Sequence, residues 1–500
     1  MIFGPVCKDV MKLQTLVKAL PQEPRLTPAS AGAEVTGLAY DSRQVKRGAL
    51  FVAIPGRHHD GSAFIEDALE RGAVAVVGEG RLALRHVPYI EVPDARRALA
   101  DMACAFYGTP ADQLEVFGIT GTNGKTTVAF MIRAILKGAG GEPGLVSTVR
   151  YEIGERVIPA GRTTPEAPDL QSLLHKMCTA GCRHAVMEVS SHALDQARVR
   201  GIDFDVGVFT NLTRDHLDYH GTMDQYFDAK RLLFRGLGQG RKPAVAVINV
   251  DDPYGRRLAE DVRSGPVSVL TYGLAADAAV RARDLALDAA GARCTVQSPW
   301  GEAPLRLPLL GRFNILNSLA ALAACGARGH GLQDMVARLE GMEPVPGRLE
   351  SVAPGHPFNV FVDYAHTDDA LQTVLEILAE ITAGRIWLVF GCGGDRDRGK
   401  RAAMGAVADR WAHHTLITSD NPRHEDPADI AAEIAAGFGA PGRYTVCLDR
   451  AAAIRSAIDR AQPGDTVLIA GKGHENYQEF KQTVIPFDDA EIARSKLAEG

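Results

Sequence analysis

The apolar residues of this chain fall into short runs separated by stretches of helical period. Runs typical of buried strands lie at 50–54, 73–77, 89–92, 114–120, 185–188, 206–210, 244–250, 386–390, 415–418 and 466–470. Helical patterns lie between several of them, at 63–71, 96–107, 128–136, 318–327 and 428–437. Strands that alternate with helices predict an α/β fold with parallel sheets covered on both faces. Ligands of such sheets bind at the carboxyl ends of the strands.

The pattern divides the chain into three blocks. Its 500 residues exceed what one hydrophobic core supports, so several domains are expected. The first block, 1–111, closes at the turn Gly108-Thr109-Pro110. The second spans 112–343, and the third, 344–500, opens with the loop Pro344-Val345-Pro346-Gly347.

Composition and charge exclude several classes of protein. A net charge of −6 and a pI near 6.2, without any basic block of five residues, argue against nucleic-acid binding. The longest apolar stretch, 309–327, is interrupted by Arg312, Asn314 and Asn317, so no membrane insertion is expected. The first residues do not form a signal peptide, and the eight cysteines show no C-x-x-C pair. We therefore expect a cytoplasmic protein with reduced thiols.

The segment T-G-T-N-G-K-T-T at 120–127 follows a predicted strand and precedes a predicted helix. It departs from the pattern G-x-x-x-x-G-K-[ST] because Ile119 stands at the first glycine position. Glycines let backbone N–H groups converge on a phosphate, while Lys125 adds a charge and Thr126 a hydroxyl for magnesium. An ordinary turn rarely combines these residues, so we predict a phosphate loop and a P-loop ATPase-like central sheet.

Four weaker signals follow later strands. Glu188 ends one strand, where a carboxylate is positioned either to hold magnesium or to interact with a helix N-terminus. Two histidines and two aspartates crowd 215–220, which would also suit a solvated loop, and Lys230 would ordinarily be a surface residue. After the strand 415–418, the turn S-D-N-P-R places Arg423 at the sheet edge or, alternatively, on the surface before a helix.

Together these motifs resemble the Mur ligase family, the ATP-dependent amide ligases that build the peptidoglycan stem peptide. The resemblance covers nearly the whole chain, and it implies a Rossmann-like C-terminal domain. Its markers are T-G-T-N-G-K-T-T (120–127), T-T-P (163–165), E-V-S-S-H-A-L (188–194), D-H-L-D-Y-H (215–220), G-R-F-N-I-L-N (311–317), P-G-R (346–348), D-Y-A-H (363–366) and G-C-G-G-D-R-D (391–397). Family members form an acyl phosphate on a substrate carboxylate, and an amine then displaces phosphate.

The resemblance implies roles for residues of the central and third blocks. ATP would be bound by Gly121, Thr122, Asn123, Gly124, Lys125, Thr126, Thr127, Asn314, Arg348 and Asp363. Two Mg²⁺ ions would be held by Thr126, Glu188, His216 and Lys230, with Lys230 carbamylated. Lys125, His216 and Lys230 would be the catalytic residues.

Substrate residues follow from the same resemblance. The first block would bind the UDP end of a UDP-muramoyl dipeptide; the residues implied for this substrate are Ser42, Arg57, His58, His59, Thr163, Thr164, Ser190, Gln196 and Arg198. The motif D-N-P-R resembles that of members that add meso-diaminopimelate, whose distal carboxylate a guanidinium can grip. The amino-acid site would comprise Arg396, Asp420, Asn421, Pro422, Arg423, Gly471 and Glu475. The expected reaction joins meso-diaminopimelate to the D-glutamate of the dipeptide, and a monomer is expected.

Three alternatives and two departures stay open. A lysine-adding ligase should lack the arginine after Asn-Pro, a folylpolyglutamate-type ligase should lack the first domain, and a nucleotide-switched binding protein would need no amino-acid pocket. Arg162 stands where family members usually have asparagine, which puts one muramoyl contact in question. Asp368 replaces a common proline, which affects the rigidity of that turn.

Overall fold

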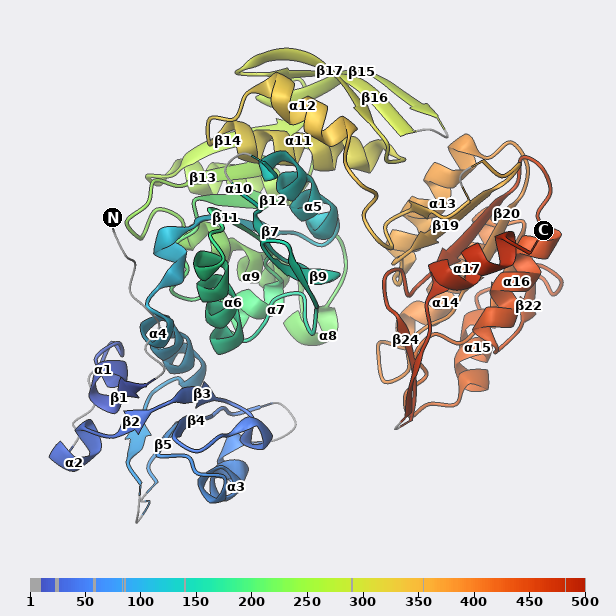
Figure 1. The fold of residues 1–500 in the computed structure, drawn as a ribbon. Coiled ribbons are helices and arrows are strands. Elements are labelled where there is room, and N and C mark those ends of the chain that lie inside the picture. The colour runs from blue at the N-terminus through green and yellow to red at the C-terminus, as the bar shows by residue number, and fades with distance from the viewer. Residues whose placement is uncertain are drawn as a thin grey trace.

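The computed structural model describes residues 10–22, 27–56, 60–82, 84, 87–138, 141–288, 291–353, 355–481 and 483–499. The chain forms three lobes in sequence order, coloured blue, green to yellow, and orange to red in Figure 1. Each lobe has its own main sheet and its own hydrophobic clusters. The predicted limits 1–111, 112–343 and 344–500 stay a prediction.

The N-terminal lobe contains, among its described residues, a four-stranded parallel sheet. Its order is β3 (Gly37–Ala39), β4 (Ala49–Ala53), β5 (Ala75–Gly78) and β6 (Tyr89–Glu91). The other elements are β1 (Met11–Lys12), α1 (Leu13–Val17), α2 (Pro28–Ala31), β2 (Glu34–Val35), the 3₁₀ turns Ser42–Gln44 and Gly61–Phe64, α3 (Ile65–Glu70) and α4 (Ala95–Tyr107). All residues of β4 and β5 are buried, as expected for strands covered on both faces.

The central lobe is built on a sheet with eleven described strands, in the order β10-β9-β8-β11-β7-β12-β13-β14-β15-β16-β17. The strands are β7 (Glu115–Thr120), β8 (Gly144–Val146), β9 (Arg150–Ile153), β10 (Arg156–Pro159), β11 (His184–Glu188), β12 (Val206–Phe209), β13 (Val245–Asn249), β14 (Ser268–Gly273), β15 (Val280–Asp288), β16 (Gly291–Ser298) and β17 (Gly301–Leu307). The helices are the 3₁₀ turn Pro110–Gln113, α5 (Lys125–Leu136), α6 (Ala167–Thr179), α7 (Ser191–Asp195), α8 (Leu217–His220), α9 (Met223–Gly236), α10 (Pro253–Arg263), α11 (Arg312–Gly326) and α12 (Leu332–Glu340). One hydrophobic cluster joins α5, α11 and α12 to one face of the sheet, and another joins α6, α9 and α10 to the opposite face.

The third lobe has a sheet of six described strands, in the order β18-β19-β23-β20-β21-β22. The strands are β18 (Glu350–Ser351), β19 (Asn359–Asp363), β20 (Ile386–Phe390), β21 (His414–Ile417), β22 (Tyr444–Val446) and β23 (Thr466–Ala470), and a separate hairpin pairs β24 (Tyr477–Phe480) with β25 (Thr483–Pro486). Helices α13 (Asp368–Ile381), α14 (Gly399–Trp411) and α15 (Pro427–Ala435) cover one face, while α16 (Arg450–Arg460) and α17 (Asp489–Leu497) cover the other.

The α/β class and the core strands predicted from the sequence are confirmed. The central sheet also has antiparallel pairs at its edges that the sequence did not indicate: β9 and β10 pair antiparallel, as do β15, β16 and β17. The edge strand β17 alternates exposed and buried residues instead of forming a continuous apolar run. Antiparallel strands can face water on one side, so the search for apolar runs missed them.

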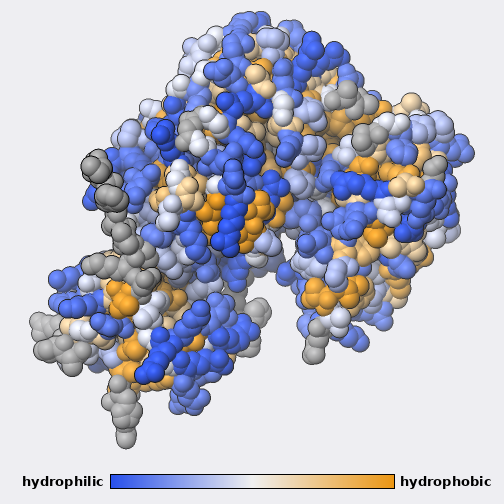
Figure 2. Space-filling view, in the orientation of Figure 1, coloured by the Kyte–Doolittle hydropathy of each residue, from blue (hydrophilic) through white to orange (hydrophobic). Residues whose placement is uncertain are grey.

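Figure 2 shows a face on which hydrophilic residues predominate, with smaller apolar patches on the N-terminal and third lobes. None of the helices in the described parts of the chain has the length and apolar content needed to cross a bilayer.

A fully buried ion pair ties the third lobe together. Arg450 donates to both carboxylate oxygens of Asp489 at 2.7 Å, and neither side chain is exposed. The same guanidinium donates to the carbonyl of Ala470, the last residue of β23, at 2.9 Å and to that of Ser419, just after β21, at 3.5 Å. The pair therefore connects α16 and α17 to the loops that leave the carboxyl edge of the sheet.

Asp489→Ala should destabilise the third lobe, because it leaves the Arg450 charge buried and uncompensated. The free energy of unfolding should fall by about 3–5 kcal/mol. Urea unfolding followed by tryptophan fluorescence checks this, since Trp387 and Trp411 lie in this lobe. Glu499→Ala is the control, because it removes the partner of Arg455 from an exposed pair and should leave stability unchanged. Equal losses in the two variants would contradict the prediction.

Candidate functional site

The predicted phosphate loop joins the end of β7 to the start of α5 (Figure 1). Gly121 and Gly124 have φ values of +152° and +85°. A Cβ atom at Gly121 would lie 1.8 Å from Thr210 Oγ1, and one at Gly124 would lie 2.4 Å from Asn317 Oδ1. Space as well as backbone conformation therefore requires glycine at both positions. No side chain caps α5, so its first N–H groups are available to an anion.

Two lysines, the partly buried Lys125 and the fully buried Lys230, converge on the carbonyl oxygen of Gly121. Lys125 Nζ donates to the carbonyls of Gly121 at 3.0 Å and Thr122 at 2.7 Å. Lys230, on α9, donates to the same Gly121 carbonyl at 2.8 Å, and its Nζ lies 4.4 Å from the centre of the Tyr226 ring. Burial lowers the pKa of Lys125; burial and the Lys125 charge hold the pKa of Lys230 well below its usual value. The Lys230 amine is thus favoured in its neutral form.

Two carboxylates face these lysines. Glu188 ends β11, is 1% exposed, and accepts hydrogen bonds from the Thr148 N–H at 2.8 Å and hydroxyl at 3.3 Å. The charges of Glu188 and Asp215 both act on Lys125, and Asp215 also acts on Lys230. Sequence reasoning selected Glu188 but did not single out Asp215, although Asp215 opens the quoted motif at 215–220.

His216 caps the short helix α8 with a backbone φ of +53°. Its ring packs edge-on against His192 with a centroid distance of 4.9 Å, and its Nε2 lies 3.5 Å from Asp215 Oδ2. Desolvation by the groups packed around the ring lowers the pKa of His216 to about 4, although 45% of its side chain is exposed. The charges of Lys125 and Lys230 act on the same ring, which places all of these groups around one centre.

The donor set at this centre can hold magnesium, which is commonly bound by a few protein oxygens together with substrate phosphates. Magnesium prefers oxygen ligands. Thr126 and Glu188 offer a hydroxyl and a carboxylate, but the carboxylates and imidazoles here do not form a three-ligand cluster within the described residues. A carbamate on Lys230 would add further anionic oxygens beside the phosphate loop.

Residues of the third lobe and its connecting segment reach the phosphate loop directly. Arg348 donates to Thr126 Oγ1 at 3.2 Å and stacks on the Tyr364 ring at 4.8 Å. Asn123 Nδ2 lies 3.4 Å from Asp369 Oδ2. Arg348 and Thr126, both predicted to bind the nucleotide, are therefore in contact.

Two other residues predicted to bind the nucleotide form hydrogen bonds with neighbouring residues of the chain. Asp363 accepts hydrogen bonds from the N–H groups of Leu349 at 2.6 Å and Ala365 at 2.8 Å, and burial raises its pKa. Asn314 is 3% exposed; it donates to the Leu310 carbonyl and accepts from Asn317. Asn317 abuts Gly124, so Asn314 braces the loop through its neighbour.

The residues predicted for the muramoyl peptide form a network around Glu188. Thr164 Oγ1 donates to the Glu188 carbonyl at 2.8 Å and accepts from the Ser190 N–H at 3.1 Å. Thr163 accepts from Thr148, while Arg198 donates to the Thr164 carbonyl at 2.9 Å and to Gln196 Oε1 at 2.7 Å. Ser42 is buried in the N-terminal lobe, and the predicted residues Arg57, His58 and His59 lie outside the described residues.

The two departures from the family pattern have local structural explanations. Arg162 pairs with Glu166 at 2.6 Å, and Glu166 also pairs with Arg198 at 2.9 Å. Asp368 is the first residue of α13, where a carboxylate is favoured by the helix dipole, and Thr367 caps the helix. Neither residue distorts the phosphate loop.

The residues of the third lobe that were predicted to bind the amino-acid substrate gather at the carboxyl ends of β20, β21 and β23. Asn421 Nδ2 donates to Glu475 Oε2 at 2.9 Å, and Lys472 donates to both residues at 3.1 Å. Gly471 has a φ of +108°, and a Cβ there would lie 2.8 Å from Asp420 Oδ2. Lys472 is fully buried and was not selected from the sequence, although the motif at 471–475 contains it.

Arg423 is linked to this cluster through Glu479 and does not lie free on the surface before a helix. Its side chain is 19% exposed, and α15 begins later, after its cap Asp426. The guanidinium donates to Glu479 Oε2 at 3.0 Å and to the Gly394 carbonyl at 2.7 Å, while the backbone holds a φ of +50°. The surface alternative is therefore wrong for Arg423, whereas Arg396 is exposed at the rim.

The chain matches three protein families along its length. These are "Mur ligase family, catalytic domain" at residues 34–107, "Mur ligase middle domain" at 119–325 and "Mur ligase, glutamate ligase domain" at 347–473. Together they account for more than half of the chain.

Full-length relatives agree. The UDP-N-acetylmuramoyl-L-alanyl-D-glutamate--2,6-diaminopimelate ligase of Geobacillus thermodenitrificans is 45% identical over 98% of this chain and 100% of its own. The ligase of the same name from Geobacter sulfurreducens is 46% identical over 97% of this chain and 98% of its own. A solved structure of a ligase of that name is 36% identical, with a TM-score of 0.69 over 98% of this chain and 99% of the other. This chain therefore belongs to the Mur ligase family.

Proposed function

We propose that this protein is an ATP-dependent ligase of peptidoglycan precursor synthesis. It joins an amino group of meso-diaminopimelate to the D-glutamate carboxylate of UDP-N-acetylmuramoyl-L-alanyl-D-glutamate through an acyl phosphate. The observation that carries the amino-acid assignment is the cluster of Asn421, Lys472 and Glu475 at the carboxyl edge of the third sheet, to which Glu479 links Arg423. A cytoplasmic location and a monomeric state remain predictions.

The phosphate loop binds the triphosphate in this proposal. Lys125 would exchange its hydrogen bonds to the Gly121 and Thr122 carbonyls for phosphate oxygens, and the N–H groups that open α5 would donate to the same anion. Arg348 contacts Thr126, so it would supply a further cation beside the nucleotide. Closure of the third lobe would exclude water from a hydrolysis-prone acyl phosphate.

Thr126, Glu188, His216 and carbamylated Lys230 would hold two Mg²⁺ ions. Bound magnesium would neutralise the charge of the triphosphate and of the attacking carboxylate. The Lys230 amine would attack CO₂: an N–C bond forms, one C=O π bond becomes a C–O⁻, and the amine proton passes to water. The product is a carboxylate at a position from which an ordinary glutamate or aspartate side chain would fall short.

The amino acid would be recognised at its distal end. Arg423 would bind the distal carboxylate of diaminopimelate through two parallel hydrogen bonds from its planar guanidinium. Asp420 and Glu475, held beside Gly471 and Asn421, would face the distal ammonium. Lysine lacks the distal carboxylate and would leave Arg423 without its substrate partner.

The alternatives fit less well. A lysine-adding ligase would not need Arg423, and a folylpolyglutamate-type ligase would lack the first lobe, which matches the Mur ligase catalytic family at 34–107. A binding protein that only senses ATP would need no amino-acid cluster in the third lobe.

Phosphate release with the UDP-muramoyl dipeptide and single amino acids tests the proposal. We expect turnover with meso-diaminopimelate and roughly 10⁴-fold lower kcat/KM with lysine, because lysine offers the Arg423 guanidinium no distal carboxylate. Equal turnover with lysine would refute the specificity. Absence of turnover with any amino acid, despite ATP binding, would refute the ligase activity and favour a nucleotide-sensing protein.

A further inference from the structure

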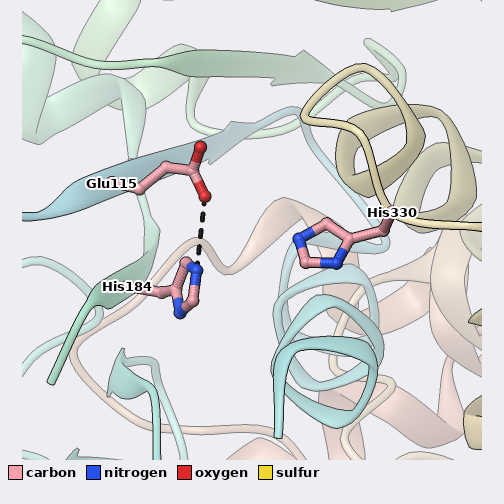
Figure 3. Close-up of side chains that lie close together, drawn as sticks. All are labelled: Glu115, His184 and His330. Carbon is pink, nitrogen blue, oxygen red and sulfur yellow. Dashed lines mark ion pairs between the residues drawn. The ribbon is translucent and has the colours of Figure 1, made fainter. Parts of the chain in front are cut away.

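A second group of metal-ligating side chains lies at the opposite edge of the central sheet from the phosphate loop. Glu115 opens β7, His184 opens β11, and His330 lies in the turn between α11 and α12 (Figure 3). One ligand atom from each lies within 4.8 Å of the other two. The phosphate loop follows Thr120 at the far end of β7, so roughly 17 Å of strand separates the two regions.

The spacing of the first two ligands matches a tetrahedral metal site. Glu115 Oε2 and His184 Nε2 are 3.4 Å apart, longer than an ordinary N–H···O hydrogen bond. Two ligands about 2.1 Å from a tetrahedral zinc ion are themselves about 3.4 Å apart. The pair is thus held at the distance that a bridging metal requires.

The His184 imidazole lacks the hydrogen bonds that a buried ring normally makes. The residue is 8% exposed, its Nδ1 has no partner within the described structure, and its Nε2 meets only the distant Glu115 oxygen. Buried polar groups are usually satisfied, and an exception points to a missing water or ion. This observation is independent of the clustering itself.

Neighbouring charges orient the carboxylate without blocking it. Arg328 donates to Glu115 Oε1, which leaves Oε2 directed at His184. Arg328 also lies 3.5 Å from Asp205, which pairs with Lys242 at 2.9 Å. The positive charge of Arg183 also acts on His184. Glu115 and Asp205 offset most of this positive charge, and outer partners of this kind fix the orientation of metal ligands.

We propose that Glu115, His184 and His330 form a binding site for a divalent transition metal, with Zn²⁺ as the best fit. Two imidazoles and one carboxylate are a zinc donor set that leaves a fourth position open, whereas magnesium prefers oxygen ligands. His330 is partly exposed and sits between Gly329 and Gly331, so its ring can close by the short distance that a third ligand needs. The bound ion would clamp β7, β11 and the α11–α12 turn together.

Zn²⁺ binding to the full-length protein tests the site. Competition against a chromophoric chelator in excess Mg²⁺ should reveal a Zn²⁺ ion whose affinity falls at least about 10-fold in His330→Gln. At a free Zn²⁺ concentration of about 100 Kd the folded-to-unfolded ratio should rise about 100-fold, giving a thermal shift that His330→Gln abolishes. Co²⁺ should give a four-coordinate visible spectrum that is lost in the same variant.

His356→Gln is the matched control, because His356 is an exposed histidine of the third lobe. It should retain wild-type Zn²⁺ stoichiometry, affinity and thermal shift. His184→Gln should behave like His330→Gln; since His184 is buried and this variant could misfold, the His330 variant decides the question. Wild-type protein without this Zn²⁺ ion, or a His330→Gln variant with unchanged affinity and spectrum, would overturn the site. Neither result would affect the proposed ligase activity.

Discussion

Lys230→Ala is expected to lower ligase turnover by about 10³-fold or more, because the variant cannot form the carbamate that completes the magnesium site. Lys230 is 1% exposed, and its pKa is held well below the usual value by burial and by the charge of Lys125. Both features favour the neutral amine that reacts with CO₂. Removing bicarbonate should lower wild-type activity reversibly, and added formate or acetate should restore part of the activity of the alanine variant.

The matched variants separate chemistry from packing. Lys230→Met keeps most of the side-chain volume and should be as inactive as Lys230→Ala. Lys176→Ala removes an exposed lysine from α6 of the same lobe and should leave kcat and KM unchanged. Intact-mass measurement should detect bound CO₂ in the wild type only. Full activity of either Lys230 variant without added carboxylate would show that the metal site is built differently.

Arg423→Ala should remove most of the preference for meso-diaminopimelate over lysine. The wild-type preference of roughly 10⁴-fold in kcat/KM should fall to about 10-fold, chiefly through loss of diaminopimelate turnover. In the wild type the Arg423 guanidinium pairs with Glu479 at 3.0 Å. Removing the guanidinium leaves the Glu479 carboxylate available to the distal ammonium of lysine. Steady-state phosphate release with both amino acids measures the change.

Arg385→Ala provides the comparison. Arg385 is exposed and precedes β20 at the opposite edge of the third sheet, so its loss should not alter either substrate. Arg423→Lys should also lose preference, because an ammonium cannot reproduce the two parallel hydrogen bonds of a guanidinium. If Arg423→Ala kept the wild-type preference for meso-diaminopimelate over lysine, other residues would have to bind the distal carboxylate.

Local sequence pattern was sufficient for the core strands and the phosphate loop. β20 and β23 have the predicted bounds, because a continuous apolar run buried on both faces is readable without knowledge of its neighbours. Gly121 and Gly124 are likewise required by backbone conformation that a strand–turn–helix pattern implies. The antiparallel edges of the central sheet were missed, since half-exposed strands such as β17 carry a weaker apolar signal.

The identity of the site residues within each motif was also available from the chain alone, through their resemblance to the Mur ligase family. The side chains and carbonyls that these residues contact could not be predicted from the chain alone. Lys125 and Lys230 are far apart in sequence yet donate to one carbonyl, Lys472 links Asn421 to Glu475, and Arg348 contacts Thr126 from the third lobe. These contacts depend on which strand ends become neighbours in a sheet, and strand order is set by long-range packing rather than by local pattern. For the same reason, Glu115, His184 and His330 show no motif along the chain, and they meet only because β7 pairs with β11 and α11 packs beside them.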